Sequence, residues 1–226
     1  MTPIKTIAIV GATGQMGSAI ARSLARSDTY RLLLMARQPG KLANLKSELE
    51  QNAPGTEVLS LSCAKEASWE ADMIIVATSY EDEREVADKI REVATGKIVI
   101  SISNPLNGSY SDLLTSPDSS AAEELQKLLP HSKVVKTFNT TFAAEFITPF
   151  IDVKAAQAFI AGNNGDAVET VAEVVKTAGF NPVIAGDLTV SRTLEQMQLL
   201  LLQFAMEYNF DWLAGWKLMP RQVERT

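Results

Sequence analysis

Short, uniformly apolar runs alternate with amphipathic stretches along the first 140 residues of the chain. The runs predict strands, and the stretches between them, in which apolar positions recur at helical spacing, predict helices. Apolar strands that alternate with helices are typical of a parallel sheet covered on both faces, so the pattern predicts an α/β fold with a doubly wound Rossmann sheet. The expected strands cover residues 6–10, 31–36, 58–61, 72–78, 97–103 and 134–137, and the expected helices cover residues 15–26, 41–51, 81–94 and 123–129.

The same alternation begins again after about residue 153. Two strands flank a helix there, and a long apolar helix follows. These elements are expected over residues 156–161, 166–177 and 181–185, and from about residue 189 to residue 202 or beyond. We therefore expect two domains, a Rossmann domain over residues 1–152 and a small C-terminal α/β domain over residues 153–226. Because the last helix is apolar on all sides, it is expected in the core or at an interface, and the oligomer we expect is a homodimer.

A glycine-rich loop joins the first predicted strand to the first predicted helix. Its sequence is Gly11-Ala-Thr-Gly14-Gln-Met-Gly17, so the spacing is G-x-x-G-x-x-G rather than the usual G-x-G-x-x-G. Glycines allow a tight turn, and they allow backbone amides to approach a pyrophosphate at the positive end of a helix. The loop follows a buried strand and opens a helix, so it predicts a dinucleotide site; the alternative is a tight turn that binds nothing.

The end of the second predicted strand indicates which dinucleotide is bound. An NAD site usually carries Asp or Glu there, to hold the ribose 2′-hydroxyl. This chain has Met35-Ala36-Arg37 instead, with Lys41 close behind. A guanidinium can pair with a 2′-phosphate through two hydrogen bonds, whereas a carboxylate would repel it. We therefore expect NADP(H), with Arg37 and Lys41 on the phosphate; the alternative is that both are solvated surface charges.

Polar residues follow three further predicted strands, where the far half of a dinucleotide site is expected. Each residue taken alone would be an ordinary turn or cap residue. Three polar groups at three neighbouring strand ends nevertheless suit a nicotinamide and its ribose. The candidate cofactor-binding residues at these ends are Thr78, Ser79, Tyr80, Asn104 and Asn139.

The composition excludes several other kinds of protein. The net charge is −6 and no basic stripe stands out, so neither nucleic acid nor a membrane surface is an expected partner. With one cysteine, Cys63, and one histidine, His131, the chain has neither an internal disulfide nor a Cys/His zinc site. The first residues do not form a signal peptide pattern and no apolar stretch is long enough to span a bilayer, so a cytoplasmic location is expected.

Several stretches resemble the family of NADPH-dependent coenzyme F420 reductases, the NADP:deazaflavin oxidoreductases. The resemblance reaches nearly the whole chain, in pieces, and residues 180–195 (FNPVIAGDLTVSRTLE) are its most specific part because a generic Rossmann domain does not require them. The other stretches are residues 11–17, Met35-Ala-Arg37 with Lys41, residues 134–140 (VVKTFNT) and Gly215-Trp-Lys-Leu218.

The resemblance implies NADP(H) along the Rossmann domain and a deazaflavin in a cleft between the two domains, stacked on the nicotinamide. By motif match, the residues that contact NADP are Thr13, Gly14, Gln15, Met16, Arg37 and Lys41. Two positions depart from the family. Ala36 stands where a hydroxyl residue is common, and Thr78-Ser79-Tyr80 lacks a proline that is frequent there.

Hydride transfer between two cofactors asks little of side chains, so no catalytic residue and no metal are expected. Two other functions stay open. One is an NADPH-dependent flavin or ferric reductase on the same fold, which the chain also resembles. The other is a non-catalytic NADP(H) redox sensor, whose glycine loop and basic second-strand end would look the same.

Overall fold

The computed structural model describes residues 4–151, 154–210 and 212–219. Its centre is an eight-stranded sheet of order β3-β2-β1-β4-β5-β6-β9-β10. The strands are β1 (Lys5–Val10), β2 (Tyr30–Met35), β3 (Val58–Leu61), β4 (Met73–Val76), β5 (Ile98–Ser101), β6 (Lys133–Lys136), β9 (Gln157–Gly162) and β10 (Asn181–Gly186), and β7 (Phe150–Ile151) and β8 (Lys154–Ala155) form a separate hairpin. The first six strands are parallel, and their order reverses between β1 and β4, which is where doubly wound sheets bind ligands.

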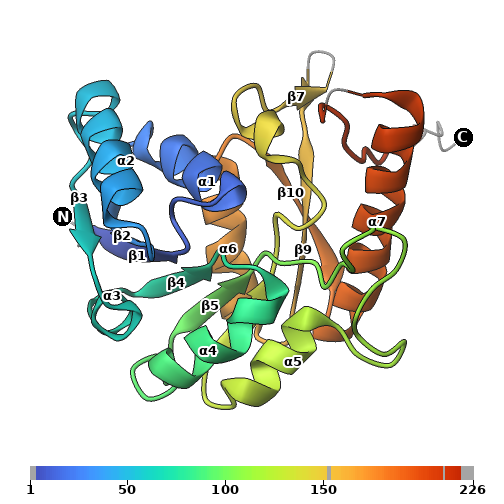
Figure 1. Ribbon diagram of the computed structural model, residues 1–226, viewed down its shortest axis with the longest axis horizontal. Helices are drawn as coiled ribbons and strands as arrows, with labels where there is room; N and C mark the ends of the chain where they lie inside the picture. Colours follow the sequence, from blue (N-terminus) through green and yellow to red (C-terminus); the bar gives the residue numbers. More distant parts are fainter. Residues whose placement is uncertain (1–3, 152–153, 211, 220–226) are drawn as a thin grey trace, which may run out of the picture.

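Helices cover both faces of the sheet, and Figure 1 shows α1 and α2 above it and α4 and α5 below it. Alternate residues of β1 contact opposite layers: Ile7 and Ile9 belong to the core under α1, α2 and α6, and Ala8 and Val10 to the core over α3, α4 and α5. The helices are α1 (Gln15–Ala25), α2 (Pro39–Asn52), α3 (Ala64–Glu70), α4 (Tyr80–Ile90), α5 (Ala121–Leu128), α6 (Gly165–Thr177) and α7 (Ser191–Tyr208).

These observations confirm the predicted α/β Rossmann fold. The short helix α3 and two 3₁₀ turns, η1 (Ala143–Phe146) and η2 (Leu188–Val190), were not predicted. Segments this short do not complete enough turns to show a helical period. Within the described residues, no helix is both long and apolar enough to cross a bilayer.

The C-terminal part of the chain extends the same sheet. Strand β9 runs antiparallel to β6, with Val135 opposite Gly162 and Lys136 opposite Ala161, and β10 then pairs with β9 in parallel. Helix α6 covers one face of this extension and α7 the other. The predicted domain boundary falls at residues 152 and 153, which lie outside the described residues, so the division into two domains stays a prediction.

Candidate active site

The glycine loop after β1 lies tightly against its neighbours. Gly11 has a φ of +91°, and a side chain there would run into the backbone carbonyl of Ala77, which follows β4. The amides of Gly11 and Ala12 both donate to the carbonyl of Met35, at the end of β2. A side chain at Gly17 would collide with the carbonyl of Gly11, so α1 can begin this close to β1 only with glycine there.

The first turn of α1 leaves backbone donors open. Gly14 is the N-cap, its own side chain offers no acceptor, and no acidic residue stands in the first turn. The first helical bond runs from the amide of Ser18 to the carbonyl of Gly14. The amides of Gln15, Met16 and Gly17 therefore point out of the helix start, where a pyrophosphate fits both the donors and the positive end of the helix dipole.

One cavity, of about 430 Å³, lies on the β2 side of this helix start. It is reached by the ends of β1, β2 and β4, by the first turn of α2 and by the face of α4 that runs from Asp82 to Lys89. Ala36, at the end of β2, brings no carboxylate to it, and the hydroxyl of Thr78 is buried without a hydrogen-bond partner among the described residues. The predicted residues that line it are Gly11, Thr13, Gly14, Arg37, Lys41, Thr78 and Ser79.

The charges in this cavity suit a phosphate only in part. Lys89 joins Arg37 and Lys41 in the lining, which sequence reasoning did not foresee. Arg37 bonds to the carboxylate of Asp82, at 2.8 Å and 3.4 Å, and Lys89 pairs with Glu85. Because the side chain of Arg37 is 74% exposed, its pair with Asp82 is weak and can give way to a stronger anion.

A second cavity, of about 890 Å³, lies on the other side of the same helix start and is called here the acceptor cleft. It lies between α1, the ends of β5 and β6, η1 and α7. The predicted residues Gln15, Met16, Asn104 and Asn139 line it. Most of its wall is apolar or aromatic, and includes Met16, Ile102, Leu106, Tyr110, Phe138, Phe142, Phe146, Ile147, Leu202 and Trp212.

Two amides hold the polar end of the acceptor cleft. Asn104 donates to the carbonyl of Asn139 at 2.9 Å, and Asn139 donates to the side chain of Asn104 and to the carbonyl of Leu194, both at 3.0 Å. The side-chain oxygens of Asn139 and Gln198 are buried and have no partner among the described residues. Both side chains line the cleft, and polar amides beside a mostly apolar wall suit a flat ligand with polar edges.

Tyr80 and Gly17 line neither cavity. Tyr80 is the first residue of α4, and its hydroxyl donates to Glu124 of α5 at 2.6 Å. Burial and the neighbouring carboxylate raise the pKa of Tyr80. The side chain therefore joins two helices below the sheet, and a contact between Tyr80 and a cofactor stays a prediction that this geometry does not favour.

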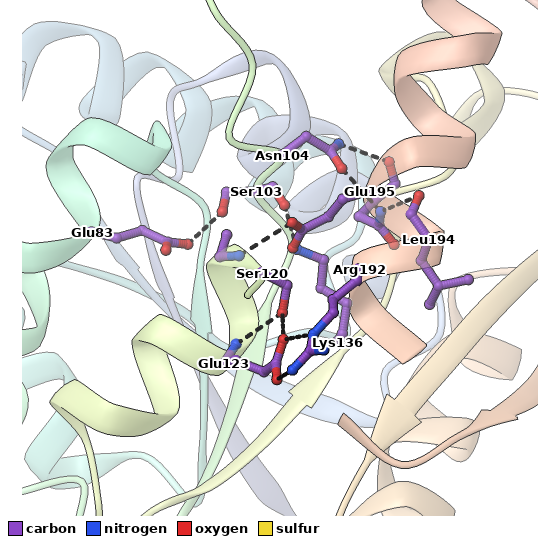
Figure 2. A network of polar contacts seen from close by, with 11 residues as sticks. Glu83, Ser103, Asn104, Ser120, Glu123, Lys136, Arg192, Leu194 and Glu195 are labelled. Atoms are coloured by element: carbon purple, nitrogen blue, oxygen red, sulfur yellow. Dashed lines mark hydrogen bonds and ion pairs between the residues drawn. The ribbon is translucent and has the colours of Figure 1, made fainter. Parts of the chain in front are cut away.

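Sequence reasoning missed a buried polar network beside Asn104, which Figure 2 shows. Lys136, the last residue of β6, is fully buried and donates to the carbonyl of Ser103 at 2.5 Å and to the carboxylate of Glu195 at 2.6 Å. Glu195 is also fully buried, and it accepts from the amide of Ala121 at 3.2 Å. The ion pair joins β6 to α7, and the hydrogen bonds of its two members extend the connection to the end of β5 and to α5.

Glu83 extends this network into α4. Its carboxylate accepts a hydrogen bond of 2.6 Å from the hydroxyl of Ser103, and the side chain is buried. Burial raises the pKa of Glu83 to about 7, although the Ser103 hydroxyl and Lys136 act in the opposite direction. A lysine that ends an apolar strand, as in Val134-Val-Lys136, was the one sequence signal that could have indicated buried charge here.

A strained residue turns the chain from β6 into the acceptor cleft. Phe138 is fully buried and has a φ of +60°, a conformation that bulky residues rarely adopt. Its ring packs on Phe146 and Phe180, with centroids 5.3 Å and 6.0 Å away. This packing holds the turn and presents Asn139 to the cleft, and such strain concentrates at functional sites.

Comparison with known proteins gives consistent matches. The family model described as NADP oxidoreductase, coenzyme F420-dependent matches residues 6–105. The F420-dependent NADP reductase of Methanocaldococcus jannaschii is 30% identical over 212 residues, which cover 90% of this chain and 93% of that protein. A crystal structure from Arthrobacter sp. FB24, provisionally described as an F420-dependent NADP reductase, has a TM-score of 0.78 and 25% identity, and the match covers 90% of this chain and 94% of that one.

The metalloreductase STEAP3 of Rattus norvegicus is also 30% identical, over 193 residues. The match covers 84% of this chain but 36% of STEAP3, so this chain spans about a third of that relative. The M. jannaschii match, by contrast, is nearly complete in both chains. On that match, this chain belongs to the family of coenzyme F420-dependent NADP oxidoreductases.

Proposed function

We propose that this protein transfers hydride between NADP(H) and a deazaflavin of the coenzyme F420 type. One observation supports this above the others: two cavities share the N-terminus of α1. The first is lined by Thr13 and Gly14, and the second by Gln15 and Met16, the next residues along the chain. A dinucleotide whose pyrophosphate lies on that helix start would reach into both.

The residues of the first cavity fit the adenosine half of NADP(H). Backbone amides at the start of α1 would hold the pyrophosphate, and Arg37, Lys41 and Lys89 would hold the 2′-phosphate. When bound, the nicotinamide supplies or accepts the hydride. The pair of Arg37 with Asp82 must open for the phosphate to take its place.

The acceptor cleft would hold the second substrate in position and keep water away from the reacting rings. Its aromatic and aliphatic walls exclude water and hold a flat ring system against the nicotinamide end of the site. The amide side chains of Asn139 and Gln198, which both line the cleft, would fix the orientation of the bound rings. The hydride would pass between two ring carbons, and the proton that neutralises the reduced ring would come from solvent, so no side chain is required as its donor.

The decisive experiment offers purified protein NADPH or NADH together with F420, FMN, FAD or a ferric chelate, and follows the nicotinamide absorbance. We expect turnover with NADPH and F420. Turnover with flavin or iron alone would instead assign the chain to a flavin or ferric reductase, a function that the similarity to the metalloreductase STEAP3 favours. Tight NADPH binding without turnover on any acceptor would indicate a redox sensor.

We also propose that the protein is a cytoplasmic homodimer. Leu200, Phe204 and Tyr208 form an exposed stripe along α7, four residues apart, and Phe210 stacks on Tyr208 at 5.7 Å. An apolar stripe of this kind on a helix that is buried on its other side supports a symmetric contact between two copies.

A further inference from the structure

The acceptor cleft carries cations at one end. Arg22 and Arg26 both line it, and they lie one turn apart at the C-terminal end of α1. Met16 and Ala19 line it too, so the cleft follows one face of this helix. At a rise of 1.5 Å per residue, the ten residues from Met16 to Arg26 span about 15 Å. The cleft therefore connects the polar amide end, where the ring is proposed to lie, to a pair of guanidinium groups.

The two arginines differ in their partners. Arg22 makes two hydrogen bonds to the carboxylate of Glu48 on α2, at 2.6 Å and 2.9 Å. Arg26 donates to the carbonyl of Phe146 at 2.9 Å and to the hydroxyl of Ser23 at 3.3 Å. No carboxylate among the described residues forms an ion pair with Arg26. Its guanidinium is thus held at the rim of the cleft by neutral groups while its charge is unmatched.

A held guanidinium without an anion is suited to bind one. Its remaining N–H donors form a planar fork that matches a phosphate or carboxylate, and the bonds to an anion are stronger than those to neutral acceptors. The apolar walls of the cleft lie beside it. A ligand that fills the whole cleft would therefore have a flat, apolar ring at one end and a negative group about 15 Å away at the other.

We propose that Arg26, with Arg22 beside it, is an anion subsite for the tail of the electron acceptor. This rests on the proposed function, and it adds a second recognition element: the ring is chosen by the apolar walls, and the acceptor's phosphodiester or carboxylate tail by Arg26. Coenzyme F420 has such a tail, whereas 7,8-didemethyl-8-hydroxy-5-deazariboflavin has the same ring system without any charge on its side chain. The two compounds therefore separate the ring from the tail.

The test compares these two ligands on Arg26→Gln, with binding measured by ligand fluorescence in the presence of NADP⁺. We expect the variant to bind F420 about tenfold more weakly or worse, through the loss of one charge-assisted hydrogen bond, and to bind 7,8-didemethyl-8-hydroxy-5-deazariboflavin as wild type does. Arg26→Lys should recover part of the F420 affinity. The affinity of wild type for F420 should also fall more steeply with added salt than that of Arg26→Gln.

A matched control is Arg91→Gln, which removes an arginine from the C-terminal end of α4, outside the cleft, and should change neither affinity. Equal loss of both ligands in Arg26→Gln would mean that Arg26 only shapes the cleft, and no loss of either would mean that no anion binds there; either result overturns the subsite. Failure of wild type to bind F420 would overturn the proposed acceptor instead. FMN and riboflavin, which differ by one phosphate, would then test the subsite in the same way.

Discussion

Of the proposed phosphate-binding residues, Arg37 is the one whose position could be predicted most directly from the sequence. Its position follows from one strand and the turn after it, so local sequence was enough to place it and Lys41 in the first cavity. The sequence could not show that Asp82, which lies 45 residues later on α4, forms an ion pair with the guanidinium of Arg37. The sequence also could not show where the side chain of Tyr80 points: α4 begins at that residue, and its hydroxyl donates to Glu124 of α5.

Replacing Arg37 with aspartate should weaken NADPH binding by roughly 10- to 100-fold, because a charge-assisted hydrogen-bond donor is exchanged for a repelling group. Binding of NADH, which has no 2′-phosphate, should change little. Calorimetric titration of both dinucleotides measures this, with Arg91→Asp as a control outside the cavity. Equal affinities in Arg37→Asp and wild type would remove Arg37 from the phosphate site.

Glu83 is expected to make stability depend on pH. Burial disfavours the charged form and raises the pKa of its carboxyl to about 7 in the folded protein, from 4.5 in the unfolded chain. Between these values the folded protein retains a proton that the unfolded chain has lost. Stability therefore falls as pH rises from about 4.5 to about 7, by up to about 3 kcal/mol at about 1.4 kcal/mol per unit.

Glu83→Gln should remove this contribution while its side-chain oxygen still accepts from Ser103. Urea unfolding of both proteins at a series of pH values measures the difference. Glu145, whose pKa burial also raises to about 7, is present in both proteins and cancels. Parallel stability curves over this interval would show that Glu83 does not titrate as described.

At the scale of elements, the strands and long helices were predictable because each shows its period within the local sequence. The Lys136–Glu195 pair was not, because its members are 59 residues apart and both belong to residue types that are mostly exposed. The full lining of the acceptor cleft was also not predictable from the sequence. Asn104 and Asn139 were named because they follow strands, but Gln198 comes from α7, whose placement depends on tertiary contacts.

Breaking the Lys136–Glu195 pair should be costly. Lys136→Met leaves the Glu195 carboxylate buried without its cation, so we expect a loss of about 3–5 kcal/mol in the free energy of unfolding. The double variant Lys136→Met/Glu195→Leu, which buries no charge, should recover much of that loss. Denaturant unfolding gives both numbers.

Lys176→Met, which breaks the exposed pair with Glu173, serves as the control and should cost less than about 1 kcal/mol. A double variant as unstable as Lys136→Met would show that the loss comes from poor packing of the methionine rather than from an unpaired carboxylate.

For the whole molecule, the class of fold was predictable from alternation alone, while the direction of β9 was not. Strand β9 lies antiparallel to β6 because of the path that the chain takes after η1. The residue pattern within β9 itself is the same for a parallel and an antiparallel strand. The sequence also did not predict that one side of α7 is exposed, because a helix that is apolar on all sides is compatible with both a core and an interface.

The proposed homodimer predicts that Phe204→Glu separates the copies. A charge in the middle of the apolar stripe should weaken association by about 2 kcal/mol, or roughly thirtyfold in the dissociation constant. Sedimentation equilibrium of both proteins tests this. Trp69→Glu, at a side chain that is 70% exposed on α3, is the control and should leave the mass unchanged. A wild-type protein with the mass of one chain would refute the dimer.

The antiparallel pairing of β6 with β9 constrains how ligands come and go. Swinging the C-terminal part away from the nucleotide-binding part about a hinge would break the sheet between Lys136 and Ala161 and separate Lys136 from Glu195. We therefore expect the cleft to keep its width, and exchange of the proposed acceptor to depend on side chains that line the cleft, which move far faster than whole domains. We therefore expect turnover to be limited by dissociation of ligands rather than by opening and closing of a hinge between the two parts.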